Sequence, residues 1–358
     1  MTENSIDAVV LVGGKGTRLR PLTVSTPKPM LPTAGVPFLM HLLARIKAAR
    51  IEHVVLSTSF KAEVFEDYFG TGESLGLDIE YVVEDEALGT GGGIRNVYDR
   101  LRGDTTMVFN GDVLGGTDLT GILQAHEANN ADVTLHLVQV GNPRAFGCVP
   151  TDATGRVLAF LEKTEDPPTN QINAGCYVFR RELIADIPAG RVVSVERETF
   201  PKLLEDGYAV YGYVDNAYWR DMGTPGDFVR GSSDLVRGIA PSPLLVGRTG
   251  ESLVDESALV KDGTLLLGGT VIGRGTEVGA GCRLDDVVVF DGVTIEPGAV
   301  LEDSIIGHGV RIGANARIKN CVIGEGAHIG ARCELQDGLR VWPGVKIPDN
   351  GIRFSSDA

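Results

Sequence analysis

The stretch GGTVIGRGTEVGAGCRL, residues 268–284, opens a repeat that decides the fold of the C-terminal part of the chain. Three segments of the same length follow it: DDVVVFDGVTIEPGAVL (285–301), EDSIIGHGVRIGANARI (302–318) and KNCVIGEGAHIGARCEL (319–335). All four place apolar residues at the same three positions. The first column is Ile272, Val289, Ile306 and Ile323; the second is Val278, Ile295, Ile312 and Ile329; the third is Leu284, Leu301, Ile318 and Leu335.

Successive columns lie six, six and five residues apart along the chain. This spacing is typical of a coil with three short strands per turn, each directing one side chain inward. Glycine follows the first and second columns in most segments, and we expect it at corners where φ is often positive. The repeat therefore predicts a triangular parallel β-helix, because a β-sandwich would alternate with a period of two residues.

Upstream of the repeat, from residue 6 to about 236, short β-branched runs alternate with stretches of helical periodicity. The expected strands are AVVLV (8–12), HVVLSTS (53–59), IEYVV (79–83), TMVFN (106–110) and VTLHLVQV (133–140), and the expected helices are FLMHLLARIKAAR (38–50), GGGIRNVYDRL (91–101) and TGILQAHEANN (120–130). The alternation indicates parallel βαβ units in an open, Rossmann-like α/β sheet. We expect this domain at 1–236, a linker at 237–252 and the β-helix at 253–358.

Bulk properties of the 358-residue chain limit the classes of function. The formal net charge of −15 argues against binding to nucleic acid or an anionic membrane, because either would need a basic face. The sequence has neither an apolar run of membrane-spanning length nor the features of a signal peptide in MTENSIDAVV. The five cysteines form no C-x-x-C pair, so we expect reduced thiols and a cytoplasmic protein.

The stretch LVGGKGTRLRPLTVSTPKP, residues 11–29, is a candidate phosphate-binding loop. Gly13, Gly14 and Gly16 follow the first expected strand, where backbone N–H groups can approach a phosphate. Their spacing matches neither G-x-x-x-x-G-K-[ST] nor G-x-G-x-x-G. The loop therefore predicts an anion site of a different kind.

Two cations of this loop suit phosphorylated ligands. The guanidinium of Arg18 can contact two phosphate oxygens at once, whereas the ammonium of Lys28 is a compact point charge. Lys28 lies between Pro27 and Pro29, which we expect to keep the backbone extended and to fix the direction of the side chain. The pair suits a triphosphate together with a second phosphorylated ligand.

Asp112 follows the expected strand TMVFN and is a candidate metal ligand. Ligands of open α/β sheets bind at the carboxyl ends of the strands. A magnesium ion is usually held by one or two carboxylates together with phosphate oxygens and water. Asp112 alone would therefore need a partner.

A series of motifs along the chain resembles the sugar-phosphate nucleotidyltransferase family. The motifs are G-G-x-G-T-R-L-R-P-L-T with P-K-P downstream, FNGD (109–112), AFGCV (145–149), FLEKTEDPP (160–168), INAGCYVF (172–179), SVERETFP (194–201) and YWRDMGTPGDF (218–228). The resemblance covers nearly the whole chain and is closest to members that guanylylate mannose 1-phosphate. It implies a GT-A-like catalytic sheet and a left-handed β-helix.

The resemblance also implies a reaction. Mannose 1-phosphate would attack the α-phosphorus of GTP in line, with Mg²⁺ present, and give GDP-mannose and pyrophosphate. Because the attacking phosphate is already largely deprotonated at neutral pH, no general base is required. Alignment and charge neutralisation remain for the protein.

The implied site residues fall into three groups. Arg18 would bind the β- and γ-phosphates, Lys28 the sugar phosphate, and Asp112 with Asp221 the Mg²⁺ ion. The nucleotide-binding residues would be Leu11, Gly13, Gly14, Gly16, Thr17, Arg18, Glu84, Gly89, Thr90 and Asp112. The sugar-phosphate-binding residues would be Lys28, Gly147, Glu162, Lys163, Asn173 and Trp219.

The base is expected to contact VEDEALGTGGGI, residues 83–94. Either Glu84 or Glu86 could accept hydrogen bonds from guanine N1–H and N2–H₂, and the sequence leaves both possible. A glucose-1-phosphate uridylyl- or thymidylyltransferase is the alternative activity.

Two other classes of function compete with nucleotidyl transfer. The β-helix also occurs in acyltransferases, for which His308 or His328 would have to act as a base, and a non-catalytic nucleotide-sugar sensor could use the same scaffold. Such a sensor would be expected to lose the charged signature, which this chain keeps. The flat faces of the β-helix favour packing, so we expect a homo-oligomer.

Overall fold

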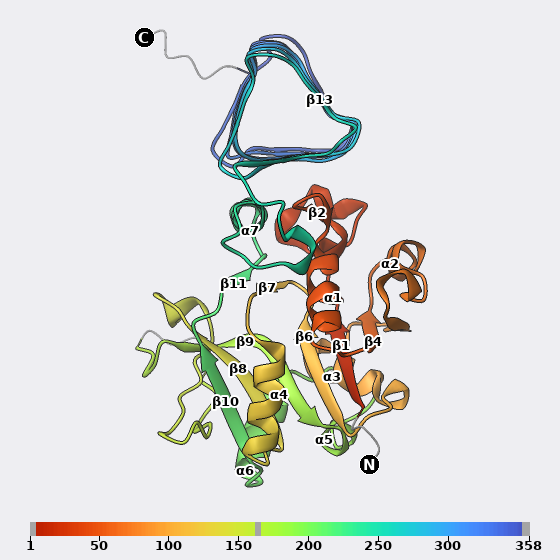
Figure 1. Cartoon of the computed structure of the whole chain (residues 1–358), viewed down its shortest axis with the longest axis vertical. Helices are drawn as coiled ribbons and strands as arrows, with labels where there is room; N and C mark the ends of the chain where they lie inside the picture. The colour runs from red at the N-terminus through yellow and green to blue at the C-terminus, as the bar shows by residue number, and fades with distance from the viewer. Residues whose placement is uncertain (1–4, 162–165, 353–358) are drawn as a thin grey trace. The chain divides into compact units, whose positions relative to one another are not determined.

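The computed structural model describes residues 5–161 and 166–352. The chain forms two compact units (Figure 1). The α/β unit comprises residues 1–14 and 42–219, and the β-helix unit comprises residues 15–41 and 220–358. Packing thus groups two segments, 15–41 and 220–236, with the β-helix rather than with the sheet.

A seven-stranded sheet with the order β10-β8-β9-β6-β1-β4-β5 forms the α/β unit. The strands are β1 (Ile6–Leu11), β4 (His53–Thr58), β5 (Asp78–Val83), β6 (Thr105–Asn110), β8 (Val133–Gln139), β9 (Gln171–Arg180) and β10 (Val210–Asp215). Strands β1, β4 and β6 are buried along nearly their whole length, because both faces of the sheet are covered. The prediction of an open α/β sheet is confirmed.

The sheet is not wholly parallel, which is a correction to the expected pattern. Strand β9 runs antiparallel to both β6 and β8. Parallel neighbours need a crossover, usually a helix. Between β8 and β9 the described residues contain only one 3₁₀ turn, η6 (Pro143–Ala145), so the chain returns in the opposite direction.

Three of the helices, α1 (Phe38–Ala48), α3 (Gly89–Asn96) and α4 (Leu119–Ala128), lie close to the stretches in which helical periodicity predicts them, and the other four were not predicted. These four are α2 (Ala62–Phe69), α5 (Arg181–Ala185), α6 (Phe200–Glu205) and α7 (Pro225–Val236), with a π-helical turn η7 (Val195–Thr199) before α6. Helix α3 packs on β1 and β4, and α4 packs on β8, β9 and β10. The side chain of Asp118 caps α4 by accepting a hydrogen bond from the N–H of Thr120 at 3.0 Å.

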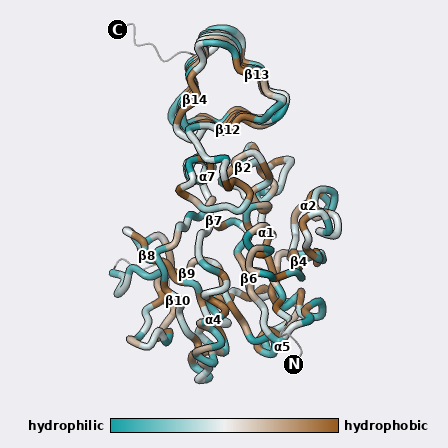
Figure 2. Tube along the Cα trace, in the orientation of Figure 1, coloured by the Kyte–Doolittle hydropathy of each residue, from teal (hydrophilic) through white to brown (hydrophobic). Residues whose placement is uncertain are grey.

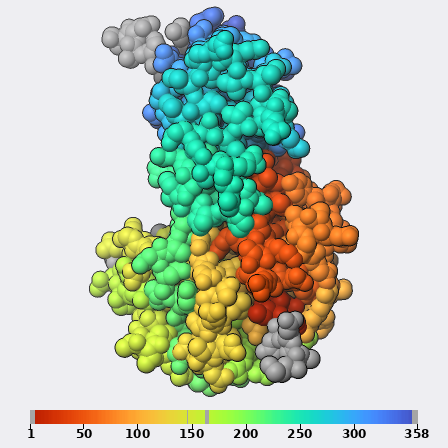
Figure 3. Space-filling model, in the orientation of Figure 1, coloured from red at the N-terminus to blue at the C-terminus, as the bar shows by residue number. Residues whose placement is uncertain are grey.

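The β-helix unit is a coil of short parallel strands with a triangular outline (Figure 1). Its strands are β12 (Ser252–Val254), β13 (Leu259–Val260), β14 (Leu265–Leu267), β15 (Thr270–Ile272), β16 (Glu277–Val278), β17 (Arg283–Val289), β18 (Thr294–Ile295), β19 (Val300–Ile306), β20 (Arg311–Ile312), β21 (Arg317–Lys319), β22 (Val322–Ile323), β23 (His328–Ile329), β24 (Glu334–Leu335), β25 (Arg340–Val341) and β26 (Lys346–Ile347). In the space-filling view, side chains fill the triangular outline of the coil (Figure 3).

The register confirms all three apolar columns. Ile272 pairs with Val289, Val289 with Ile306 and Ile306 with Ile323, and the other two columns pair in the same way. All twelve column residues are buried in one core cluster. The hydropathy colouring of Figure 2 places hydrophobic residues at matching positions of successive turns. Burial of these aliphatic side chains, each worth about 1.5–3 kcal/mol, is the main stabilisation of the coil.

The glycines that follow the columns have a different role from the expected one. Gly279 and Gly307 do not have positive φ. A Cβ on Gly279 would lie 2.5 Å from the backbone nitrogen of Pro297, and one on Gly307 would lie 2.8 Å from the carbonyl oxygen of Ile323. These glycines let successive turns approach, whereas positive φ occurs at other glycines of the coil, such as Gly275 and Gly292.

All five cysteines are free and buried. Within the described part of the chain, no helix has the length and apolar character needed to cross a membrane.

Candidate functional site

The β-helix unit brings together three of the predicted site residues. Arg18 lies in η1 (Thr17–Leu19), Lys28 begins η3 (Lys28–Met30), and Asp221 ends β11 (Trp219–Asp221). Arg18 Nη2 is 4.0 Å from Asp221 Oδ2, and Lys28 Nζ is 3.9 Å from Asp221 Oδ1. The Lys28 side chain is 9% exposed and that of Arg18 is 64% exposed. One carboxylate thus joins a buried and an accessible cation.

A tight turn at Gly16 brings these cations to the same place. Gly16 adopts the left-handed conformation at φ 53°, and its carbonyl accepts a hydrogen bond from Thr23 Oγ1 at 2.8 Å. A Cβ on Gly16 would lie 3.1 Å from the Cβ of Lys28. Glycine is therefore required at this turn for residues 15–29 to fold back beside Lys28. We call residues 15–29 the hairpin.

The backbone at Lys28 differs from the prediction. Pro27 is extended, but Lys28 begins a 3₁₀ turn, in which the N–H of Met30 donates to Pro27 O at 2.9 Å. The expected extended backbone is therefore wrong at Lys28. The direction of its side chain is fixed by this turn and by burial.

Arg220 anchors the strand that carries Asp221. Its guanidinium donates to Asp227 Oδ1 at 3.4 Å and to Asp234 Oδ2 at 3.1 Å, and both carboxylates belong to α7. A Cβ on Gly223 would lie 2.7 Å from Arg18 Nη2, so glycine is needed there for the guanidinium to approach. Helix α7 and Gly223 therefore determine the geometry of the Arg18–Asp221 pair.

In the α/β unit, the glycine turn and Asp112 lie at the carboxyl ends of neighbouring strands. Leu11 pairs with Asn110, and the N–H of Gly111 donates to Leu11 O at 2.9 Å. A Cβ on Gly111 would lie 2.7 Å from that carbonyl, so glycine lets the turn that leads to Asp112 pack on β1. Gly13 and Gly14 follow β1 directly, at the edge where open α/β sheets bind ligands.

The glycine-rich turn at the start of α3 packs tightly on residues 191–195. The N–H of Gly91 donates to Val193 O at 2.8 Å, and a Cβ on Gly89 would lie 2.6 Å from the same oxygen. Thr90 Oγ1 donates to Glu196 Oε2 at 2.9 Å and accepts from the N–H of Val195 at 3.0 Å. Two of the residues predicted to bind nucleotide, Gly89 and Thr90, therefore make close protein contacts.

The two candidate base-reading carboxylates differ in environment. Glu84 is buried; its Oε1 accepts from Ser57 Oγ at 3.0 Å and its Oε2 accepts from the N–H of Leu88 at 3.0 Å. Glu86 is exposed. Glu84 thus holds the loop through buried hydrogen bonds, whereas Glu86 is accessible to solvent.

The predicted sugar-side residues gather around β9. Asn173 Oδ1 accepts from the N–H of Gly175 at 3.0 Å, and Asn173 Nδ2 donates to Tyr177 Oη at 2.8 Å. Trp219 Nε1 donates to Ala174 O at 3.0 Å. A Cβ on Gly147 would lie 3.1 Å from Leu161 O, and Glu162 and Lys163 lie outside the described residues.

A sequence model described as nucleotidyl transferase matches residues 7–238, and one described as GMPPB C-terminal domain matches residues 248–352. The chain belongs to the nucleotidyl transferase family. A mannose-1-phosphate guanylyltransferase of Mycobacterium tuberculosis is 68% identical over 358 residues and is covered completely, as is this chain.

Solved structures resemble about two thirds of the chain. HddC from Yersinia pseudotuberculosis is 28% identical with a TM-score of 0.57, covering 64% of this chain and 99% of that one. The same protein complexed with GMP-PN has a TM-score of 0.56, 28% identity and the same coverage.

The carboxylates of this nucleotidyl transferase fit a divalent metal. The described residues contain no group of three or more His, Cys, Asp or Glu placed to hold a metal ion. Asp112 and Asp221 each carry carboxylate oxygens, which are the kind of donor that Mg²⁺ prefers.

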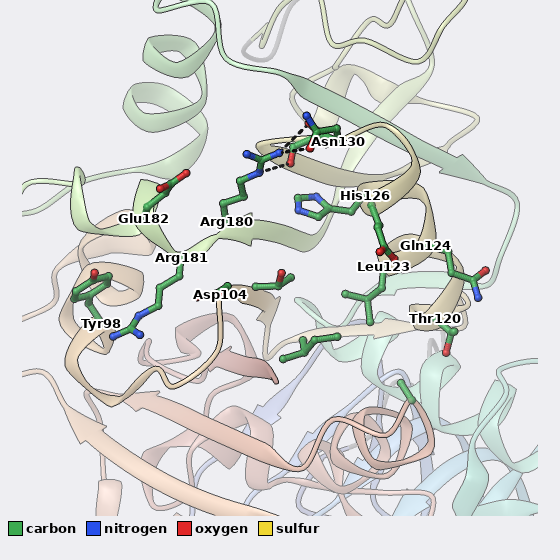
Figure 4. Close-up of a pocket in the computed structure, with 15 residues that line it drawn as sticks. Tyr98, Asp104, Thr120, Leu123, Gln124, His126, Asn130, Arg180, Arg181 and Glu182 are labelled. Carbon is green, nitrogen blue, oxygen red and sulfur yellow. Dashed lines mark hydrogen bonds between the residues drawn. The ribbon is translucent and has the colours of Figure 1, made fainter. Parts of the chain in front are cut away.

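A cavity of about 820 Å³ lies elsewhere in the α/β unit (Figure 4). It is lined by the first residues of β1 and β6, at the edge opposite Leu11 and Asn110. Arg180 projects toward it, but its guanidinium donates to the carbonyl oxygens of Ala131 and Asn130 at 3.0 and 3.1 Å. None of the predicted site residues lines this cavity.

Sequence reasoning missed three residues that organise the nucleotidyl transferase site: Tyr177, Glu196 and Arg220. Each belongs to a motif that the sequence singled out, INAGCYVF, SVERETFP or YWRDMGTPGDF. Thr90 lies 106 residues from Glu196, whereas the partners of Tyr177 and Arg220 lie 4 to 19 residues away. A motif alone does not show which of its residues make these contacts.

Proposed function

We propose that this chain transfers a guanylyl group from GTP to α-D-mannose 1-phosphate, giving GDP-mannose and pyrophosphate with Mg²⁺ as the metal. The full-length similarity to the Mycobacterium tuberculosis enzyme supports the substrates. The structural observation that carries the proposal is the position of Asp221 within 4.0 Å of both Arg18 and Lys28.

The charges suit two phosphorylated substrates. Arg18 is the accessible fork and would bind the departing β- and γ-phosphates, whereas the buried Lys28 would neutralise the attacking sugar phosphate. Phosphate oxygens compete with Asp221 for both cations. Substrate binding would therefore release the oxygens of Asp221 for the metal.

The metal would be held by Asp112 and Asp221. When bound, Mg²⁺ supplies charge neutralisation at the α-phosphate. Every other role belongs to the chain: Thr17 and the glycines 13, 14 and 16 would cradle phosphate, and Asn173 would bind sugar hydroxyls.

Guanine would be read by the loop at residues 83–94. Of its two candidates, Glu86 is exposed and both oxygens of Glu84 already accept hydrogen bonds. We therefore place Glu86 at the base edge and Glu84 behind the loop. The GMP-PN complex of HddC, a 28% identical relative, supports a guanine nucleotide.

The cellular setting is part of the proposal. Five free, buried thiols fit the reducing cytoplasm.

The oligomeric state and the domain division are also part of the proposal. Exposed Leu259, Leu265 and Trp342 on the coil support a homo-oligomer. The division into a catalytic domain (1–236), a linker (237–252) and a β-helix domain (253–358) stays a prediction.

A pyrophosphate-release assay tests the activity. GTP, ATP, UTP and dTTP are each paired with mannose 1-phosphate and with glucose 1-phosphate, with and without Mg²⁺. We expect GTP with mannose 1-phosphate to have the highest kcat/KM by at least about tenfold, because the base and sugar contacts differ by more than one hydrogen bond. A tenfold preference for UTP or dTTP would refute the proposal.

A further inference from the structure

Glu196 is a carboxylate held by hydroxyl groups from three parts of the α/β unit. It lies in the π-helical turn η7, half-buried. Its Oε2 accepts from Thr90 Oγ1 at 2.9 Å and from Ser194 Oγ at 2.8 Å, and its Oε1 accepts from Tyr177 Oη at 3.4 Å. An acceptor-only group is required, because all three hydroxyls donate to it.

Tyr177 connects Glu196 to the sugar side. Tyr177 is fully buried, and its Oη accepts from Asn173 Nδ2 at 2.8 Å while it donates to Glu196. The other end of the Asn173 amide accepts from the N–H of Gly175 at 3.0 Å. The Asn173 side chain is therefore fixed in one orientation, with Tyr177 on its amide nitrogen and the N–H of Gly175 on its amide oxygen.

Thr90 connects Glu196 to the nucleotide loop. Its hydroxyl donates to Glu196 and accepts from the N–H of Val195 at 3.0 Å, so both hydrogen-bonding capacities face η7. The N–H of Val193 donates to Leu88 O at 2.9 Å, and the N–H of Gly91 donates back to Val193 O at 2.8 Å. Backbone hydrogen bonds thus join the loop to the segment before η7.

We propose that Glu196 is a positioning residue that couples the sugar side of the site to the nucleotide loop. One carboxylate orients Asn173 through Tyr177 and holds Gly89 and Thr90 through the Thr90 hydroxyl. The inference rests on the proposed function only in taking Asn173 as a sugar contact and residues 83–94 as the base loop. Glu196 itself touches neither reacting phosphate.

Glu198 provides a matched control on the same turn. Its Oε1 accepts from the N–H of Ser194 at 3.0 Å, and its Oε2 is 3.3 Å from Arg191 Nη2. Its side chain is 47% exposed and has neither Thr90 nor Tyr177 among these partners. Glu198→Gln makes the same chemical change as Glu196→Gln but leaves the hydrogen bonds of Glu196 to Thr90 and Tyr177 in place.

The test compares KM values rather than activity alone. KM for mannose 1-phosphate is measured at saturating GTP, and KM for GTP at saturating mannose 1-phosphate, for wild type, Glu196→Gln, Tyr177→Phe, Thr90→Ala and Glu198→Gln. We expect Glu196→Gln to raise both KM values by about fivefold or more, since in either orientation of the amide its nitrogen cannot accept a hydrogen bond from the hydroxyl that it faces. Tyr177→Phe should raise KM for mannose 1-phosphate alone, and Thr90→Ala KM for GTP alone.

The double variant Glu196→Gln/Tyr177→Phe tests whether Glu196 acts on Asn173 through Tyr177 or whether each substitution disturbs the site independently. If both act along one path, its KM for mannose 1-phosphate equals that of the worse single variant. Full multiplication of the two effects, or a Glu196→Gln enzyme with both KM values within twofold of wild type, would overturn the inference. Wild-type GDP-mannose synthesis in the same assay shows whether the proposed function holds independently.

Discussion

At the scale of single residues, the two proposed metal ligands Asp112 and Asp221 are the most direct places to test the proposed reaction. Asp221 is 32% exposed at its side chain and is met by two cations. Asp112 follows a turn whose backbone is fixed by the Gly111–Leu11 hydrogen bond. Their side chains can therefore be changed while the backbone around them stays in place.

Asp112→Asn should lower Mg²⁺-dependent kcat by roughly 100-fold or more, because an amide oxygen binds the metal without neutralising it. The melting temperature should stay within a few degrees of wild type. Steady-state kinetics over a Mg²⁺ titration and thermal unfolding measure the two effects.

Asp118→Asn is the control for this substitution. Asp118 caps α4, and asparagine caps a helix about as well as aspartate. Both kcat and melting temperature should therefore remain unchanged. Near-normal turnover in Asp112→Asn would reject its role as a metal ligand.

At the residue scale, the sequence singles out a residue when its chemistry is unusual in its local context. Arg18 and Lys28 stand out in a glycine- and proline-rich loop, and the structure joins them to Asp221. Glu196 could not be found, since its three hydroxyl partners come from segments up to 106 residues away. Nor does the sequence reveal that Glu84 is buried and Glu86 exposed.

At the scale of elements, the contact between α4 and β8 contains a buried histidine. His126 of α4 is 7% exposed, and its Nδ1 is 2.9 Å from Thr134 Oγ1 of β8. Burial, with the nearby charge of Arg180 adding to it, lowers the pKa of His126 to about 4. The folded state therefore holds this imidazole neutral at a pH where the unfolded chain protonates it.

The sign of the pH effect follows from this lowered pKa. The contribution of His126 to stability is present above the unfolded pKa of about 6.5 and is lost as the pH falls toward 4. Between pH 7 and pH 5 the free energy of unfolding should fall by about 2 kcal/mol from this group. Burial also lowers the pKa of His41, so a comparison of variants is needed.

His126→Gln isolates that contribution. Glutamine does not titrate in this range, so the loss of stability between pH 7 and pH 5 should be smaller in the variant by about 2 kcal/mol. Urea denaturation at the two pH values measures the difference. Equal losses in the variant and the wild type would show that His126 does not control this transition.

Helices and strands could be predicted from the sequence where their pattern of apolar residues lies within one segment or repeat. The β-helix columns define strand positions and register, because each turn repeats the one before it. Strand β9 was recognised only as a motif, and its antiparallel direction depends on the path between Val140 and Asn170, which no periodicity encodes.

At the scale of the whole molecule, the β-helix does more than offer flat faces for packing. Arg340 Nη1, on β25, donates to the carbonyl oxygen of Arg20 at 2.7 Å, two residues after Arg18. Ser25 Oγ donates to Glu325 Oε2 at 3.4 Å. The last turns of the coil therefore support the hairpin that carries both cations, within one compact unit.

Arg340→Ala should weaken this support and raise KM for GTP by about fivefold, which corresponds to the roughly 1 kcal/mol of one exposed, charge-assisted hydrogen bond. The melting temperature should change little, since the coil's core does not include this side chain. Arg332→Ala is the matched control: Arg332 Nε donates to Asn350 Oδ1 at 3.0 Å, away from the hairpin. If both variants bind GTP as wild type does, the coil stabilises the hairpin without setting the position of Arg18, and its role in the reaction is confined to packing.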